Sequence, residues 1–156
     1  MRLAWTKSQY LLELLCLAML LGMITRVVNI WDTLPGYFPV VDQAGEILRK
    51  EPKTVLLTFP MIAATIGMTI GLILCLPPAK WNMPCRIKEG NTVKVYSFTR
   101  TMVLVIQAEL FACFTLLQTV ALRFQPVPKF AIPLFVAIIA VTGALMILGI
   151  FRLNRR

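Results

Sequence analysis

The sequence predicts an all-α membrane protein, a bundle of four transmembrane helices with both termini in the cytoplasm. Of its 156 residues, 58% are hydrophobic and 15% are charged, whereas a soluble domain carries about 25% charged residues. The charges gather in short stretches between long apolar runs, as in integral membrane proteins. We therefore expect one membrane domain over residues 1–156 and no second, soluble domain.

Four apolar segments have the length of a transmembrane helix. Each has about 20 residues, which at about 1.5 Å per residue crosses a hydrocarbon core about 30 Å thick. Lipid offers no partner to backbone amides, so helices are expected, and the sequence lacks the alternation of a membrane β-strand. The first apolar run is too long for a signal peptide and no small-residue cleavage site follows it, so we expect a retained helix. The expected spans are residues 10–30, 54–76, 101–122 and 131–151.

Lysine and arginine in the short loops predict the orientation. Residues 1–9, 77–100 and 152–156 carry ten of them, whereas the loops of residues 31–53 and 123–130 carry five. Since basic residues are enriched on the cytoplasmic side, both termini should be cytoplasmic and residues 31–53 should form an outer loop. Basic residues at helix ends anchor to anionic lipid head groups, which accounts for the net charge of +9 without a nucleic-acid partner.

The cytoplasmic loop, residues 77–100, contains a turn signal. Glu89, Gly90 and Asn91 lie between two segments with some strand character, so a short β-hairpin is expected near residues 85–97. An isolated hairpin is marginally stable in water and would need support from the bundle or a partner. The alternative is a connector that lies on the lipid surface.

The outer loop, residues 31–53, contains the stretch LPGYFPVVDQAG at residues 34–45. Its prolines favour extended backbone and its glycines permit tight turns. Residues 42–51 are expected to form a short surface helix, and the aromatic residues suit the head-group belt, so the loop should fold back onto the membrane. The residues expected to meet a peptide or protein partner are Pro35, Tyr37, Pro39, Asp42, Gly45 and Lys53.

A family resemblance rests on the spacing of prolines, a glycine and a lysine over residues 10–77. These residues resemble the membrane domain of unknown function found in SdpI-type bacteriocin immunity proteins, where a paired Leu-Pro-x-x-Ile-Pro precedes a Gly, a Lys and a helical Pro. Val41 stands where that family usually has a histidine, and the segment before the glycine is one residue short. The matching residues are Leu34, Pro35, Phe38, Pro39, Gly45, Lys53 and Pro60.

The resemblance implies a function and a location. It implies a protein of the bacterial cytoplasmic membrane that protects against a secreted peptide toxin and signals to a cytoplasmic regulator.

Two acidic residues lie within the expected spans, where ionisable groups are functional candidates. Glu109 is eight residues into the third span, about 12 Å deep, and should be level with Thr69 and Thr142. We expect a neutral carboxyl that is hydrogen-bonded to a threonine or a backbone carbonyl, with a structural role and a proton or substrate role both open. Glu13 lies about one turn from the cytoplasmic end and is expected to reach the interface or to meet Lys7.

The third span is polar on two sides. Gln107 and Gln118 are eleven residues apart and share a helix face, while Glu109 points about 200° away from Gln107. This span should therefore be central, with neighbours on both sides. In the second span, Gly67 and Gly71 form a GxxxG motif that favours close helix packing, either within the chain or between two copies of it.

The sequence contains no constellation typical of an enzyme. It has no histidine, no Cys-x-x-Cys pair and no phosphate-binding glycine loop, so we expect free thiols, no metal and no cofactor. Two classes of function stay open. The first is a binding or immunity-type membrane protein whose outer loop meets a peptide or a partner, and the second is a small transporter or transporter subunit that uses Glu109.

Overall fold

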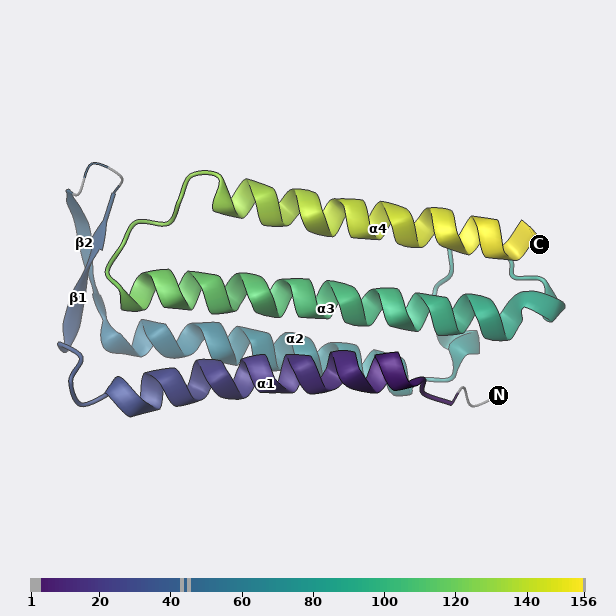
Figure 1. Cartoon of the computed structure of the whole chain (residues 1–156), viewed down its shortest axis with the longest axis horizontal. Coiled ribbons are helices and arrows are strands. Elements are labelled where there is room, and N and C mark those ends of the chain that lie inside the picture. Colours follow the sequence, from purple (N-terminus) through teal and green to yellow (C-terminus); the bar gives the residue numbers. More distant parts are fainter. Residues whose placement is uncertain (1–3, 43, 45, 156) are drawn as a thin grey trace.

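The structure, a computed structural model, describes residues 4–42, 44 and 46–155. Four long helices run side by side along the longest axis of the molecule, and a small two-stranded sheet covers one end of them (Figure 1). The helices are α1 (Lys7–Ile30), α2 (Thr58–Cys75), α3 (Thr92–Leu122) and α4 (Ala131–Arg155). The strands are β1 (Tyr37–Val41) and β2 (Ile47–Pro52), and three short 3-10 helices are η1 (Lys53–Leu57), η2 (Pro78–Lys80) and η3 (Glu89–Asn91).

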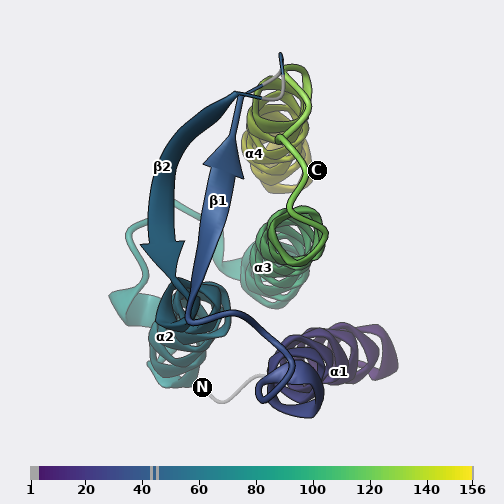
Figure 2. The ribbon, with the colours of Figure 1, turned by 90° about the vertical axis from the view of Figure 1, so that its left-hand side faces the viewer.

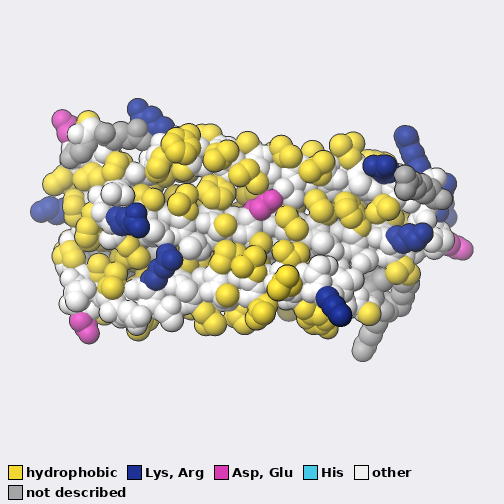
Figure 3. All heavy atoms as spheres, in the orientation of Figure 1, with side chains coloured by type: hydrophobic (Ala, Val, Ile, Leu, Met, Phe, Trp, Pro, Cys, Tyr) yellow, Lys and Arg dark blue, Asp and Glu magenta, His cyan; other side chains and the backbone are white. Residues whose placement is uncertain are grey.

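The four predicted spans are confirmed as helices that are long and apolar enough to cross a membrane. Apolar side chains cover the middle of the visible face, while lysine and arginine gather towards its two ends (Figure 3). Many apolar side chains of the helices are open to the surroundings, for example Leu72 with 72% of its surface exposed. Such a surface suits contact with lipid and would be costly in water.

The helices define two ends of the molecule. Helix α1 begins and α4 ends at the same end, which we call the termini end (Figure 1). The sheet and the connection between α3 and α4 lie at the opposite end, the hairpin end (Figure 1). This arrangement agrees with four crossings, which leave both termini on one side.

The β-hairpin predicted near residues 85–97 is wrong. Helix η3 occupies the expected turn, and α3 begins directly after it, nine residues earlier than the predicted residue 101. The hydroxyl of Thr92 donates to the carbonyl oxygens of Lys88 and Glu89, and the side chain of Asn154 in α4 accepts from the Lys88 backbone N–H at 2.8 Å. These bonds satisfy groups that a hairpin would have paired between its strands.

The helix predicted for residues 42–51 is also wrong, because residues 47–51 belong to β2. β1 and β2 pair antiparallel, with Phe38 opposite Glu51 and Val40 opposite Arg49, and we call β1, β2 and their turn the hairpin. Asp42 closes the turn, since its Oδ1 accepts from the backbone N–H groups of residues 44 and 46 at 2.8 and 2.9 Å. An aspartate that caps a turn in this way competes with helix formation.

Helix α3 is the central helix, as its two polar sides predict. Viewed from the hairpin end, α1 and α2 lie on one side of α3 and α4 lies on the other (Figure 2). The hairpin rises from the start of α2 across the end of the bundle towards α4 (Figure 2). α4 makes its main helix contacts with α3, whereas α1, α2 and α3 form a three-helix group.

The GxxxG motif contributes to packing through one of its two glycines. A Cβ on Gly67 would lie 3.1 Å from the ring of Phe111 in α3, so the missing side chain brings α2 close to α3. Gly71 has open space around it, so its expected role in packing within the chain is not supported. The buried cluster at this level also contains Cys16, Met23 and Ala63.

The contact between α3 and α4 depends on a glycine that sequence analysis did not single out. A methyl group on Gly149 would overlap the ring of Phe98, whereas one on Gly143 would meet nothing within 4 Å. We expect Gly149→Ala to lower the free energy of unfolding by about 1–3 kcal/mol, because the ring must move out of its packed position. Titration of the purified protein with SDS in mixed micelles measures this change. Gly143→Ala is the matched control, and equal losses in the two variants would contradict the packing.

Candidate functional site

The base of the hairpin is held to the end of α1 by Lys53, the first residue of η1. Its Nζ donates to the carbonyl oxygen of Trp31 at 3.0 Å and lies 4.6 Å from the centroid of the Trp31 ring. Its backbone N–H donates to the carbonyl oxygen of Gly36 at 3.0 Å. A cation–π contact and a charge-assisted hydrogen bond on one ammonium group make Lys53 an anchor of the hairpin, not an open partner-binding charge.

The other five residues predicted for a partner site have different surroundings. Asp42 is occupied by the turn, and Pro39 lines a hollow under the hairpin. Pro35 and Tyr37 are exposed, Tyr37 with 67% of its surface open. Gly45 lies outside the described residues. The predicted residues therefore do not form one cluster. Pro39 lines the hollow together with residues of α2 and of the end of α3.

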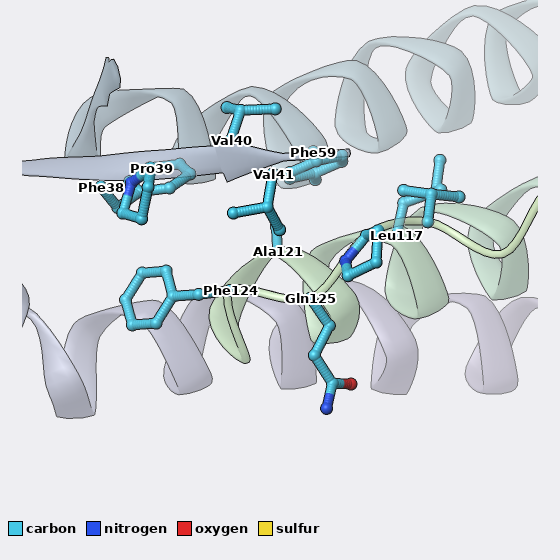
Figure 4. A pocket seen from close by; sticks show the side chains of 11 residues that line it. Phe38, Pro39, Val40, Val41, Phe59, Leu117, Ala121, Phe124 and Gln125 are labelled. Carbon is cyan, nitrogen blue, oxygen red and sulfur yellow. The ribbon is translucent and has the colours of Figure 1, made fainter. Parts of the chain in front are cut away.

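This hollow has a volume of about 360 Å³ and lies between the hairpin and the end of α3 (Figure 4). Small-ligand pockets have volumes of about 300–1,000 Å³, so it has room for a compact apolar group. The lining comes from three parts of the chain that are far apart in sequence. The lining residues are Phe38, Pro39, Val40, Val41, Phe59, Leu117, Ala121, Phe124, Gln125, Pro126 and Val127.

The walls of the hollow are almost entirely apolar. The polar side chain among them, Gln125, turns its amide away from the other labelled side chains (Figure 4). One wall depends on Phe124, which has a φ of 52° just beyond the end of α3. This left-handed conformation is uncommon for a bulky residue, and it sets the ring 5.8 Å from that of Phe38. The helix end and the hairpin thus meet through an aromatic pair at the hollow.

Behind the hollow, the hairpin packs onto the helices through a buried cluster. Phe38 of β1, Val27 of α1 and Leu56 of η1 are 6% exposed or less, and residues at the end of α3 pack against them. Gln118 adds polar links at the same end, because its Nε2 donates to the carbonyl oxygens of Met23 and Leu56 at 3.2 and 3.4 Å. A two-stranded sheet is marginal by itself, and these contacts give it the support that it needs.

The intramembrane polar site predicted around Glu109 is found in part. The hydroxyl of Thr142 in α4 donates to Glu109 Oε1 at 2.6 Å, so of the expected partners, a threonine or a backbone carbonyl, a threonine is found. Thr69 is not part of this site, because its hydroxyl donates to the Thr65 carbonyl oxygen within α2 at 2.8 Å. Depth along the helix predicted that Thr69 is level with Glu109, but α2 packs on the opposite side of α3.

A second polar pair lies on that opposite side. Gln107 Nε2 donates to Glu13 Oε2 at 3.3 Å, which links α3 to α1. The expected ion pair of Glu13 with Lys7 is absent among the described residues, whose one salt bridge joins Arg49 and Glu51. The two intramembrane acids are therefore held on different faces of α3 and do not line one route.

Sequence analysis missed a polar and aromatic cluster at the termini end. Gln9 is fully buried, and its Nε2 donates to Thr101 Oγ1 at 2.9 Å. Arg100 is 4% exposed, and its guanidinium lies 5.1 and 5.9 Å from the ring centroids of Trp5 and Trp81. One sequence signal could have pointed to Gln9. Thr6 and Gln9 have the Thr-x-x-Gln spacing of a capping box, and they form one at the start of α1.

These features define a multi-pass helical membrane protein with a β-hairpin over one end of its bundle. No group of three or more metal-binding side chains occurs within the part of the chain that the structure describes. The chain matches no protein-family model, no curated protein and no solved structure.

The role of Lys53 can be tested by amide hydrogen exchange. We expect Lys53→Met to raise the exchange rate of the backbone amides of β1 and β2 by about tenfold or more, because a charge-assisted hydrogen bond contributes about 1.5–3 kcal/mol. Lys50→Met is the control, since Lys50 is an exposed residue of β2 with the same charge. If both variants exchange as slowly as the wild type, Lys53 does not hold the hairpin.

The Glu109–Thr142 bond can be measured by a double-mutant cycle. Glu109→Leu and Thr142→Val each remove the bond, and we expect a coupling of about 0.6 kcal/mol in the free energy of unfolding, the usual value for such bonds in membranes. Glu109→Gln should lose less than Glu109→Leu, because its amide oxygen still accepts from the hydroxyl. SDS titration gives all these values, and a coupling of zero would mean that the bond contributes nothing.

Proposed function

We propose that the protein binds an apolar segment of a secreted peptide in the hollow under the hairpin, as a membrane protein of the immunity type. The observation that carries the proposal is this hollow of about 360 Å³, with apolar walls, at one end of a membrane bundle. An apolar side chain of a bound peptide would leave water or lipid head groups and gain about 1.5–3 kcal/mol on burial. The exposed ring of Tyr37 on the neighbouring strand offers a second contact.

The proposal places the hairpin end outside the cell and both termini in the cytoplasm. Residues 1–9, 77–100 and 152–156 hold ten basic residues, against five in residues 31–53 and 123–130, and this difference supports the orientation by the positive-inside rule. A peptide that arrives from outside would then meet the hairpin first. Signalling to a cytoplasmic partner would use the opposite end, where α4 and the connection before α3 are joined through Asn154.

The resemblance to the SdpI-type membrane domain supports the same proposal and suggests a bacterial cytoplasmic membrane. Two of its matching positions have clear places here. Lys53 anchors the hairpin, and Pro60 is buried in the first turn of α2, where its missing N–H costs no helical hydrogen bond. Val41, in the place of the family's usual histidine, lines the hollow, which makes an apolar ligand more suitable than a charged one.

Transport through a path that includes Glu109 is the second candidate. A transporter needs several polar groups along one route, and transporters place their binding sites at the interface of helices near the middle of the membrane. Glu109 faces α4, while Glu13 and Gln107 meet on the other side of α3. We rank transport below peptide binding because these groups do not converge.

A deletion strain tests the proposed function. We expect a bacterial host that lacks this protein to become about tenfold more sensitive to peptides secreted by neighbouring bacteria, and the wild-type gene to restore resistance. Ala121→Phe fills the hollow and should fail to restore it, since the loss of one buried apolar side chain costs about one order of magnitude in affinity. Growth inhibition by culture supernatants is the measurement.

Leu48→Phe is the matched control, because Leu48 lies on the exposed surface of β2 outside the hollow. Both variants must be present in the membrane in equal amounts by immunoblot. Resistance restored fully by Ala121→Phe would contradict peptide binding in the hollow. Unchanged sensitivity of the deletion strain, together with substrate flux in proteoliposomes that Glu109→Gln abolishes, would favour transport.

A further inference from the structure

A second hollow lies within the helical part of the molecule, towards the termini end. It has a volume of about 330 Å³ and is bounded by α1, α2 and α3. Helices α1 and α2 each pack more extensively against α3 than against each other, so a gap remains between them. Small residues widen this gap, because Ala64 and Gly67 face it from α2. This hollow is separate from the one under the hairpin and shares no residue with it.

The hollow is lined by one carboxyl group, that of Glu13, and by the amide of Gln107. Gln107 is 2% exposed, and its Oε1 is buried without a hydrogen-bond partner among the described residues. Its Nε2 donates to Glu13 Oε2 at 3.3 Å, so its orientation is held by that bond. Both side chains line the hollow, together with the thiol-bearing Cys16. A buried acceptor without a donor costs about 1–3 kcal/mol, and an intramembrane carboxylate without a cation is also costly.

The hollow is polar at its shallow end and apolar at its deep end. Glu13 lies six residues after the start of α1, about 9 Å from it at the helical rise. Leu20, which also lines the hollow, lies about 10 Å further along the same helix. Leu17 and Met68, with 51% and 65% of their surfaces exposed, border the hollow on the side open to lipid. An amphiphile in the lipid leaflet at the termini end has the same arrangement of polar and apolar groups. Its head group lies near the membrane surface and its tail lies deeper.

We propose that this hollow binds an amphiphilic primary amine, with the ammonium group on the Glu13 carboxylate, which the amide of Gln107 holds in place. A primary ammonium has three N–H donors and a positive charge, so it can donate to the carboxylate and neutralise it. An alcohol supplies one donor and no charge, and a quaternary ammonium supplies charge and no donor. The alkyl chain lies along the apolar part of the hollow. The amine is either a free amphiphile or the head group of an aminophospholipid.

Binding of radiolabelled dodecylamine to the full chain in phosphatidylcholine nanodiscs tests the proposal. Scintillation proximity separates saturable binding from partition into lipid, and empty nanodiscs give the background. We expect saturable binding that unlabelled dodecylamine displaces, and that dodecanol and dodecyltrimethylammonium displace at least about tenfold less effectively, since a hydrogen bond to a charged group contributes about 1.5–3 kcal/mol. Displacement by all three amphiphiles at equal concentrations would overturn the proposal.

Variants locate the site. Glu13→Gln should weaken binding about tenfold or more, while Glu109→Gln, which makes the same change on the opposite face of α3, should leave it unaltered. Leu17→Trp adds a bulky side chain at the lipid-exposed border and should block entry without touching the polar pair. Thermal unfolding of each variant verifies the fold. Wild-type affinity in both Glu13→Gln and Leu17→Trp would overturn the proposal.

Lipid composition distinguishes the two sources of the amine. If an aminophospholipid is the natural occupant, replacing part of the phosphatidylcholine with phosphatidylethanolamine should lower the apparent affinity for dodecylamine in the wild type. The same replacement should have no effect in Glu13→Gln. An affinity that does not change with phosphatidylethanolamine assigns the site to a free amine. None of these outcomes depends on peptide binding at the hairpin end.

Discussion

Helix α3 carries buried polar side chains on two opposite faces, and the positions of the other helices depend on them. In lipid the apolar surfaces of helices have little reason to leave their surroundings, so packing and interhelical hydrogen bonds decide which helices meet. Gln107 and Gln118 donate to α1, Gln118 also donates to η1, and Glu109 faces α4. Each bond is weak, but together they define which side of α3 each neighbour occupies. The small residues at Gly67 and Gly149 then set how closely α2 and α4 approach.

The two ends of the bundle are closed in different ways. At the termini end, the Arg100 guanidinium contacts two tryptophan rings, and Asn154 joins the end of α4 to the connection before α3. At the hairpin end, the closing element is a sheet that rests on a buried phenylalanine and is anchored by Lys53. A two-stranded sheet cannot fill the space above helix ends as side chains in a bundle do. The apolar hollow under the hairpin follows from this difference in shape.

The helical part of the fold was predictable because the length and polarity of an apolar run depend on the bilayer and not on the neighbours of the helix. The pairing of Glu109 with Thr142 was also predictable, since the helical rise gives the depth of each residue. The same reasoning failed for Thr69, because depth does not reveal which side of α3 a helix occupies. Because Gln107 and Glu109 point in opposite directions, the sequence predicted that α3 has neighbouring helices on two sides. It did not predict which helix lies on which side.

The two extramembrane predictions failed for a related reason. The turn-forming residues at positions 89–91 are also common just before a helix. Here Thr92 and Asn154 form hydrogen bonds with the backbone of this segment and so stabilise the start of α3. Residues 42–51 hold few strand signals of their own, but Asp42 closes a turn that brings them opposite β1. Local preference in both segments is weak, so partners far away in sequence decide the outcome. Neither hollow could be predicted, because each is the space left between side chains from at least three separated segments.

The two hollows share α2 and α3 as walls, and the side chains of these helices explain their different chemistry. Near the hairpin, Phe59 of α2 and Leu117 of α3 present large apolar groups, and the polar side chain of the lining, Gln125, turns its amide away from the others. Towards the termini end, α2 presents Gly67, and the amide of Gln107 in α3 holds the Glu13 carboxylate at the hollow. A ligand at the first site is selected by shape and burial alone. A ligand at the second must also supply a donor, which makes that site the more selective of the two.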